Sequence, residues 1–293
     1  MAPKCIFVKP AYYTLAVAAL HQLGWSPWHA GRQVLRPSSA KTIGGGDLLL
    51  SHIVVLSLAG FIIGLSKAGF GGFAGIVVGP MLALWLPPRE ALGLMLPLLI
   101  AGDLFSVPYY WGKWDSRNLL LLAIPSLIGI AVGGRILAGI PDELLKRLIG
   151  GIALVFSIGQ LARERLGDRA AAWHLKPIHG VIAGFATGIF STMAHLGGLP
   201  VVFYLLPQRL PAITFVATSV WLFFFVNLAK VPVYVRNGLI TMHEVTTVAR
   251  LLPATAIGAL SGVWLRKRVS DRVVNVVVLV LTVITAIKLV VAP

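Results

Sequence analysis

From Asp47 to its C-terminus the chain is an almost unbroken series of apolar runs, and this feature restricts its fold more than any other. A membrane-spanning helix needs roughly 20 apolar residues, and hydrocarbon offers no partner to unpaired backbone groups. The runs predict an all-α polytopic membrane protein of about ten helical segments, of which the second and seventh are short and follow Gly-rich breaks. These segments lie at about 48–66, 73–87, 90–111, 118–139, 144–162, 178–195, 198–207, 212–235, 245–265 and 272–291.

Composition supports the membrane class. Of the 293 residues 57% are hydrophobic and 12% are charged, whereas about 25% of a soluble domain is charged. The formal charge of +15 would favour nucleic acid in a soluble protein, but most Lys and Arg here stand in short loops. They indicate topology control and contact with anionic lipid, so we expect no nucleic-acid partner. The single cysteine, Cys5, allows no internal disulfide, and we expect no metal and no cofactor.

Residues 1–46 differ from the rest of the chain. Their apolar stretch is interrupted by polar residues, which makes it a poor span and a poor signal peptide. Two interpretations stay open, an interfacial helix and an artefact of the chosen start site. We predict an N-terminal extension over 1–46, a first transmembrane repeat over 47–162, a basic cytoplasmic linker over 163–177 and a second transmembrane repeat over 178–293.

The two halves carry similar landmarks in the same order. A Gly-rich break, a short apolar run and a Leu-Pro-x-Arg sequence occur in each, and then a long apolar run follows. Matching Gly71-Gly72 to Gly197-Gly198 gives an offset of 126, and matching Pro87 to Pro207 gives 120. Five segments per half is an odd number, so the second half enters the membrane from the opposite side. The sequence therefore predicts two inverted-topology repeats with broken helices at the Gly-rich signatures.

Loop charges give an orientation. Three loops separated by even numbers of segments carry ten Lys/Arg, and the opposite connections carry about four. The positive-inside rule makes the ten-charge side cytoplasmic and both termini external, although the basic residues of the extension conflict with that placement. The ten are Lys113, Arg117, Arg163, Arg165, Arg169, Lys176, Arg266, Lys267, Arg268 and Arg272.

The first break suits an anion. A helix unwinds in lipid only where protein or water pairs the freed backbone groups, and the helix that follows presents N–H groups with a positive dipole end. Ser66, Lys67 and the backbone of Gly69–Gly72 could form a cradle. Two alternatives stay open. The glycines could serve only close helix packing, and Lys67 could extend along the helix to the membrane interface.

The second break places His195 at the corresponding point, after Ser191 and Thr192. Its imidazole titrates near neutral pH, so it could bind substrate or couple transport to protons, or it could be a hydrogen-bonded packing residue. Asp103 is an acid well inside a span, where an unpaired carboxylate would be costly. It either pairs with a lysine or stays protonated, and a structural ion pair and a proton relay both remain open.

The eighth segment carries a partly polar face. Asn227 and Lys230 lie late in it, and Thr218 and Ser219 lie two to three turns earlier. We predict that this face contacts substrate, with extension of Lys230 to the interface as the alternative.

Two stretches resemble the signatures of the sulfite exporter TauE/SafE family. They are Gly64–Gly72, which reads GLSKAGFGG, and Ser191–Pro200, which reads STMAHLGGLP. The resemblance covers about residues 48–290. It implies a multi-pass transporter of the bacterial inner membrane that moves sulfite, sulfonates or other organosulfur anions, usually outward. Phe73 and Leu199 depart from the usual pattern, where a glycine and a proline are common.

The sequence therefore predicts a secondary transporter of a small sulfur-containing anion that works by alternating access, and no enzyme. No nucleotide-binding P-loop appears, so a proton gradient or the membrane potential would drive it. The alternatives are an anion channel, a membrane scaffold and an intramembrane enzyme with Ser191 as nucleophile and His195 as base. A homo-oligomer is left open. The predicted substrate-binding residues are Ser66, Lys67, Gly69, Phe70, Gly71, Gly72, Ser191, Thr192, His195, Gly197, Gly198, Thr218, Ser219, Asn227 and Lys230, and those for proton coupling are His195 and Asp103.

Overall fold

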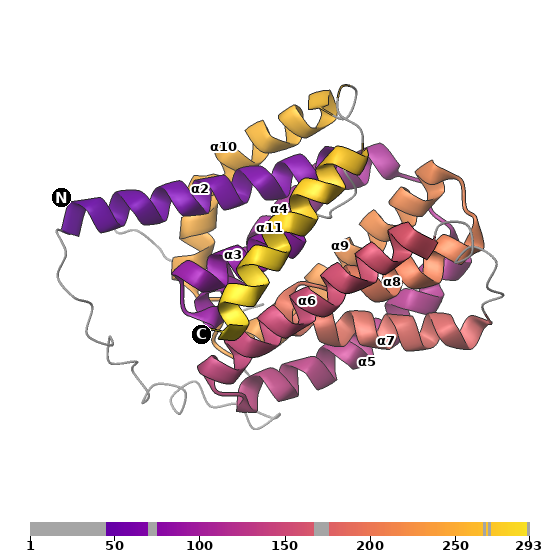
Figure 1. Ribbon diagram of the computed structural model, residues 1–293, viewed down its shortest axis with the longest axis horizontal. Helices are drawn as coiled ribbons and strands as arrows, with labels where there is room; N and C mark the ends of the chain where they lie inside the picture. The colour runs from indigo at the N-terminus through magenta and orange to yellow at the C-terminus, as the bar shows by residue number, and fades with distance from the viewer. Residues whose placement is uncertain (1–44, 70–74, 167–175, 266–267, 269–270, 292–293) are drawn as a thin grey trace, which may run out of the picture. The chain divides into compact units, whose positions relative to one another are not determined.

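A computed structural model describes residues 45–69, 75–166, 176–265, 268 and 271–291. These residues contain ten α-helices and two 3-10 helices (Figure 1). The chain divides after Leu48, and residues 49–293 form one compact unit that holds all the helices except the first residues of α2. The elements are α2 (Gly45–Gly69), α3 (Gly75–Trp85), α4 (Pro88–Ser106), η1 (Val107–Tyr110), α5 (Ser116–Gly139), α6 (Asp142–Leu166), α7 (Pro177–Ala194), α8 (Gly198–Leu205), η3 (Leu206–Gln208), α9 (Ala212–Arg236), α10 (Met242–Leu265) and α11 (Asp271–Val291).

Six helices are long and apolar enough to cross a membrane, within the part of the chain that the structure describes. They span Pro88–Tyr110, Ser116–Gly139, Asp142–Ala162, Pro177–Ala194, Ala212–Arg236 and Met242–Gly262. Their outer faces are apolar, as on α5, where Leu120, Ile124 and Ile128 are more than half exposed. A soluble monomer rarely exposes apolar surface of this extent, whereas lipid covers it without cost. The chain is therefore a multi-pass, all-α membrane protein.

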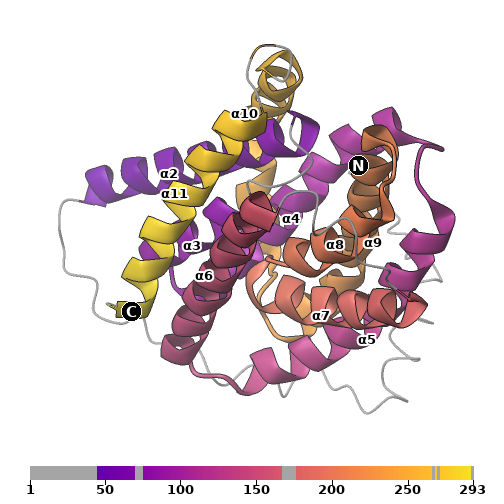
Figure 2. The same cartoon turned by 45° about the vertical axis from the view of Figure 1, so that its right-hand side comes forward.

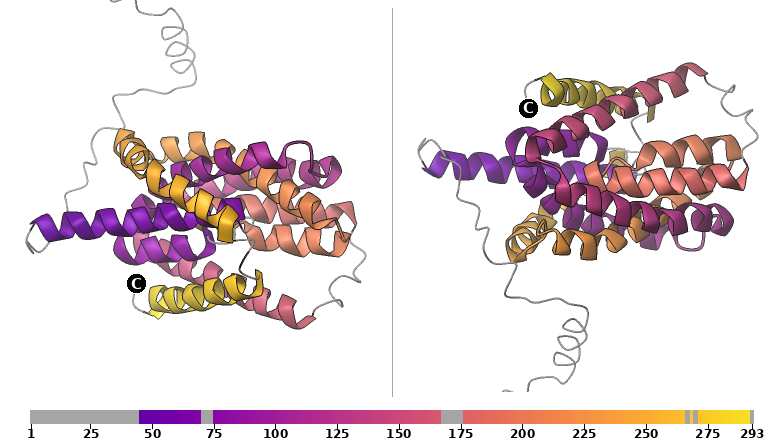
Figure 3. Two further views of the ribbon diagram at one scale, coloured as in Figure 1. Left: turned by 90° about the horizontal axis from the view of Figure 1, so that it is seen from above. Right: turned by 90° about the horizontal axis from the view of Figure 1, so that it is seen from below.

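Glycines bring α5 and α7 into close contact along their length (Figures 1 and 3). A Cβ added at Gly184 of α7 would lie 2.3 Å from the carbonyl oxygen of Leu122, and one at Gly188 would lie 2.2 Å from that of Ser126. Residue numbers rise together along the two helices, so α5 and α7 are parallel. Side chains larger than hydrogen at these positions would force the backbones apart.

A second parallel contact of the same kind joins α2 and α10. A Cβ at Gly64 of α2 would lie 2.0 Å from the carbonyl oxygen of Thr255. A Cβ at Gly258 of α10 would lie 2.1 Å from that of Phe61, and one at Gly262 would lie 2.2 Å from that of Leu65, so residue numbers rise together along the two helices. We call these two glycine-lined contacts, α5 with α7 and α2 with α10, the glycine seams. Each seam joins a helix from the first half of the chain to one from the second.

Helices α4 and α9 cross in opposite directions near the centre of the unit. Asn227 of α9 contacts Asp103 of α4, and the indole N–H of Trp221 donates to the carbonyl of Tyr110, just after α4. Residue numbers thus decrease along α9 in the direction in which they increase along α4, so the two helices are antiparallel. Helices α6 and α11 also pack against each other (Figure 2). Both pairs again combine one helix from each half.

The predicted segments match the ten helices to within a few residues at most ends. Pro87 and Pro207, matched in the sequence, occupy different structural positions, because Pro207 lies in η3, whereas Pro87 precedes the first residue of α4. The proline that precedes α9 in the same way is Pro211, with φ −50° and ψ 140° against −51° and 138° at Pro87. Residues 1–44 and 167–175 of the predicted extension and linker lie outside the described residues.

Candidate functional site

The predicted break in the second half is present. Helix α7 ends at Ala194, and α8 begins at Gly198. Between them His195 adopts a left-handed backbone with φ 55° and ψ 24°, and its N–H donates to the carbonyl of Ser191 at 3.0 Å. Histidine tolerates this conformation better than most side chains other than glycine and the short Asn and Asp. Rare backbone conformations of this kind cluster at functional sites, so the left-handed conformation of His195 marks the second break as a candidate site.

The first break is described only at its edges. Helix α2 ends at Gly69 and α3 begins at Gly75. Phe70, Gly71 and Gly72, three of the predicted substrate-binding residues, lie outside the described residues. Helix α3 nevertheless reaches the second break, because a Cβ added at Gly79 would lie 3.2 Å from the carbonyl oxygen of Ala194.

Lys67, Asp103 and Asn227 form a buried cluster. The ammonium group of Lys67 pairs with Oδ1 of Asp103, and the amide of Asn227 donates to the other carboxylate oxygen, Oδ2, at 2.7 Å. Lys67 is 6% exposed and Asp103 0%. The alternative in which Lys67 extends to the interface is therefore wrong, and the predicted pairing of Asp103 with a lysine is confirmed. Ser66, also buried, lies beside this cluster in the chain.

Lys230 is 0% exposed, so its alternative extension to the interface is also wrong. Its Nζ contacts the carbonyl oxygen of Ser191 at 3.2 Å, the Oγ of Ser191 at 3.0 Å and Nδ1 of His195 at 3.0 Å. An ammonium group has three N–H donors and no acceptor, so three acceptors satisfy it fully. All three are uncharged, which distinguishes Lys230 from Lys67.

His195 uses both ring nitrogens. Nε2 lies 3.1 Å from the carbonyl oxygen of Leu92, which can only accept, so Nε2 carries the proton and Nδ1 accepts from Lys230. The network thus assigns a neutral imidazole. Neither nitrogen is free to take a proton from Ser191, and the hydroxyl of Ser191 contacts Lys230. The nucleophile-and-base arrangement that an intramembrane enzyme would need is not formed by these two residues.

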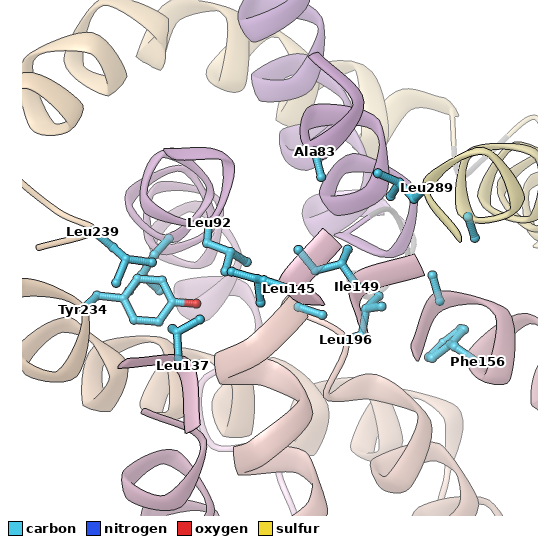
Figure 4. Close-up of a cluster of buried hydrophobic side chains, with 14 residues drawn as sticks. Ala83, Leu92, Leu137, Leu145, Ile149, Phe156, Leu196, Tyr234, Leu239 and Leu289 are labelled. Atoms are coloured by element: carbon cyan, nitrogen blue, oxygen red, sulfur yellow. The ribbon is translucent and has the colours of Figure 1, made fainter. Parts of the chain in front are cut away.

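Tyr234 borders the site. Its hydroxyl donates to the carbonyl of Thr192 at 2.7 Å and lies 3.4 Å from Nε2 of His195. In Figure 4 its ring lies among the side chains of Leu92 and Leu137, and Leu196 belongs to the same apolar cluster. The polar groups around His195 are therefore enclosed on this side by hydrocarbon, where electrostatic interactions are strong.

Helix α9 connects the two polar groups. Asn227, Lys230 and Tyr234 recur at helical spacing, which places them on one face. Lys230 lies close enough to Lys67 and Asp103 for direct electrostatic interaction with both. The signature residues of the two halves, Lys67 and His195, thus belong to one buried network that electrostatic interactions connect.

Thr218 and Ser219 lie away from this network, whereas Gly197 packs beside Ser191. Thr218 accepts a hydrogen bond from the backbone N–H of Asp115 at 2.9 Å, and Ser219 donates to the carbonyl of Phe215 at 3.0 Å. Thr218 precedes Asn227 by nine residues, roughly 13 Å along a helix. The carbonyl of Gly197 accepts from Thr187 at 3.2 Å, and Gly198 is the first residue of α8.

Sequence reasoning missed two members of the site, Tyr234 and the carbonyl group of Leu92. Tyr234 could have been found, because it continues the spacing of Asn227 and Lys230 on one helix face. The role of Leu92 could not have been found, because every residue has a backbone carbonyl and the sequence does not show which one a side chain will contact. Among the described residues, no group of three His, Cys, Asp or Glu side chains could hold a metal ion.

The fold and the buried charges define a multi-pass membrane protein with an enclosed polar site between its two halves. Residues 56–289 match the model of the family described as sulfite exporter TauE/SafE. The match covers most of the chain, and the chain belongs to this family of membrane transporters. Searches of curated proteins and of solved structures gave no match.

Proposed function

We propose that this protein is a secondary transporter that carries a small sulfur-containing anion, such as sulfite or a sulfonate, out across the bacterial inner membrane. One observation carries the proposal. The buried network holds two lysines against one carboxylate, and the ammonium group of Lys230 meets only uncharged acceptors. A buried charge without a counter-charge is costly, and intramembrane ionisable residues usually mark a transport pathway. An anion at Lys230 would supply the missing charge.

Lys230, Ser191 and His195 would hold that anion. The three N–H donors of Lys230 would turn from Ser191 and His195 to the anion, and the Ser191 hydroxyl would add a donor. Charge-assisted hydrogen bonds of this kind are about twice as strong as neutral ones. His195 would then be free to accept a proton at Nδ1, so this residue is also the site at which we place proton coupling, together with Asp103.

Matched positions in the two halves support the inverted repeat. Pro87 and Pro211 precede α4 and α9 and are 124 residues apart, as are Gly64 and Gly188 in the two glycine seams. Two repeats related by a two-fold axis in the membrane plane would make their equivalent helices antiparallel, as α4 and α9 are. Asp103 and Asn227 are also 124 residues apart and bond to each other, as two equivalent residues beside such an axis would.

Alternating access follows from the enclosure of the site. Lys230 and Asp103 are both 0% exposed, so an anion reaches them only when helices separate. Repeats related by an in-plane two-fold axis offer two equivalent openings, one toward each side of the membrane. A channel would instead need a continuous open path through these side chains.

Flux into proteoliposomes tests the proposal. Uptake of sulfite, sulfate, thiosulfate, sulfoacetate and taurine would be measured in turn with the purified wild-type protein. The Lys230→Met variant would be measured in parallel. We expect saturable flux of at least one sulfur anion and a loss of about 10- to 100-fold in the variant. Unsaturable flux would favour the channel, and flux of none of these anions would contradict the proposal.

A Lys288→Met variant provides the matched control, because this lysine is exposed near the end of α11 and touches no part of the site. It should transport at the wild-type rate. An equal loss in both lysine variants would point to a general effect of removing positive charge.

A further inference from the structure

We infer that the site selects singly charged anions over doubly charged ones, and that Asp103 sets this preference by cancelling the charge of Lys67. The inference rests on the proposed function, since it concerns the anion bound at Lys230. It goes further by assigning the valence of the substrate and the residue that determines it.

The charge of the network can be counted from its hydrogen bonds. The Lys67–Asp103 ion pair contributes zero. Lys230 is counted as +1 in the anion-bound state, because an adjacent anion favours its ammonium form, and His195 is counted as neutral, with Nε2 donating to the carbonyl of Leu92. A proton that moves from Lys230 to His195 leaves this count unchanged, whereas a proton that His195 takes from the medium raises it to +2, so the count applies to the state before a coupled proton enters. Residues 70–74 carry no ionisable side chain in the sequence, so they do not alter it.

A buried site with a charge of +1 is matched by an anion of charge −1. A monoanion makes the occupied site neutral, whereas a dianion leaves one negative charge inside a low-dielectric environment without compensation. Such an uncompensated buried charge costs several kcal/mol, far more than the difference in hydrogen bonding between two oxyanions of similar shape. We therefore expect the site to bind a sulfonate with one charge more tightly than sulfate, although both present tetrahedral sulfur with oxygen acceptors.

Asp103 is the residue that keeps the net charge of the network at +1. It is fully buried, its two oxygens are occupied by Lys67 and Asn227, and it interacts electrostatically with Lys230 as well. Without its negative charge the network would carry +2, which matches a dianion. While it is ionised, Asp103 would thus act as a counter-ion that neutralises one of the two lysines.

Asn227 supplies an internal control. It occupies the corresponding position of α9, 124 residues after Asp103, and the two side chains bond to each other at 2.7 Å. Exchanging them in an Asp103→Asn/Asn227→Asp variant moves the carboxylate across a single hydrogen bond while the total charge stays at +1. The exchange therefore separates the effect of net charge from the effect of position.

The experiment measures binding and transport of methanesulfonate, a monoanion, and of sulfate, a dianion, at pH 7.5. Binding would be followed as anion-dependent thermal stabilisation of purified protein, and transport as flux in proteoliposomes. The wild type should favour methanesulfonate by at least about tenfold. Asp103→Asn should shift the ratio toward sulfate by at least about tenfold, and the exchanged variant should keep the wild-type preference.

A Lys67→Met/Asp103→Asn variant keeps the inference testable if the single variant fails to fold. It removes both members of the ion pair, a change that a buried site often tolerates, and it leaves the network at +1. It should favour methanesulfonate as the wild type does.

Equal binding of the two anions by the wild type, or an unchanged ratio in Asp103→Asn, would overturn the inference while leaving the transporter intact. A double variant that favours sulfate would overturn it too. Absence of binding and flux for every anion in the wild type would instead contradict the proposed function. The two failures are therefore distinguishable in one set of measurements.

Discussion

The two buried lysines of this protein sit in contrasting surroundings. Lys67, beside the first break, is paired with the carboxylate of Asp103, whereas Lys230, beside the second break, meets a carbonyl, a hydroxyl and an imidazole. Both are hydrogen-bonded, but only the first is neutralised. The difference teaches that one lysine is part of the framework of the site and the other holds the charge that is available to a ligand.

The largest expected effect concerns the neutralised lysine. Asp103→Ala leaves Lys67 buried without its counter-charge, which should lower the free energy of unfolding by about 3–5 kcal/mol. Asp142→Asn breaks the pair of Arg89 with Asp142, in which both side chains are at least 30% exposed. It should cost about 0–1 kcal/mol. Denaturant titration in detergent compares the two variants, and similar losses would remove the proposed distinction between the pairs.

The second prediction concerns the other lysine. Lys230→Met loses three hydrogen bonds but also removes a buried, uncompensated charge, so its free energy of unfolding should stay within about 1–2 kcal/mol of the wild type. The apparent affinity for anions, measured as anion-dependent thermal stabilisation, should nevertheless fall by about 10- to 100-fold. A variant that binds anions normally but unfolds easily would reverse the roles given to the two lysines.

The glycine seams should respond more moderately. Gly188→Ala places a methyl group 2.2 Å from the carbonyl oxygen of Ser126, and Gly64→Ala places one 2.0 Å from that of Thr255. Each should lower the free energy of unfolding by about 1–3 kcal/mol, and by similar amounts if the seams are equivalent. Gly151→Ala meets nothing within 4 Å and is the control. Loss of stability in only one seam would weaken the case for related halves.

The smallest effect is expected at Tyr234. Tyr234→Phe removes the hydrogen bond to the carbonyl of Thr192 and keeps the ring among its apolar neighbours. The free energy of unfolding should fall by about 1–2 kcal/mol. Anion affinity should change by less than about threefold, because Tyr234 does not contact Lys230 by hydrogen bonding. A loss as large as that of Lys230→Met would place Tyr234 within the binding site itself.

The helices and the second break could be predicted because their causes are local. Apolar length fixes a spanning helix, and a cluster of glycines next to His195 indicates where a helix stops. Asp103 could be predicted to pair with a lysine, since an isolated carboxylate in hydrocarbon is too costly to retain.

The choice of partner could not be predicted. Lys67 and Lys230 look alike in sequence, and their difference arises from the packing of α2 beside α4, which pairs Asp103 directly with Lys67, whereas Asp103 acts on Lys230 only through space. Thr218 and Ser219 stand on the same helix as Lys230, yet Thr218 bonds to the backbone of Asp115 instead. Contacts made across the fold determine these outcomes, and helical spacing alone cannot specify them.

The glycine seam between α2 and α10 has a consequence for synthesis in the cell. Helix α2 is complete at Gly69, but its partner begins only at Met242. At the usual 5–20 residues per second, roughly 10–35 s pass before the ribosome has made the surface on which α2 will pack. During that interval the glycine face of α2 lacks α10 as its partner, whereas α7 follows α5 after only one intervening helix.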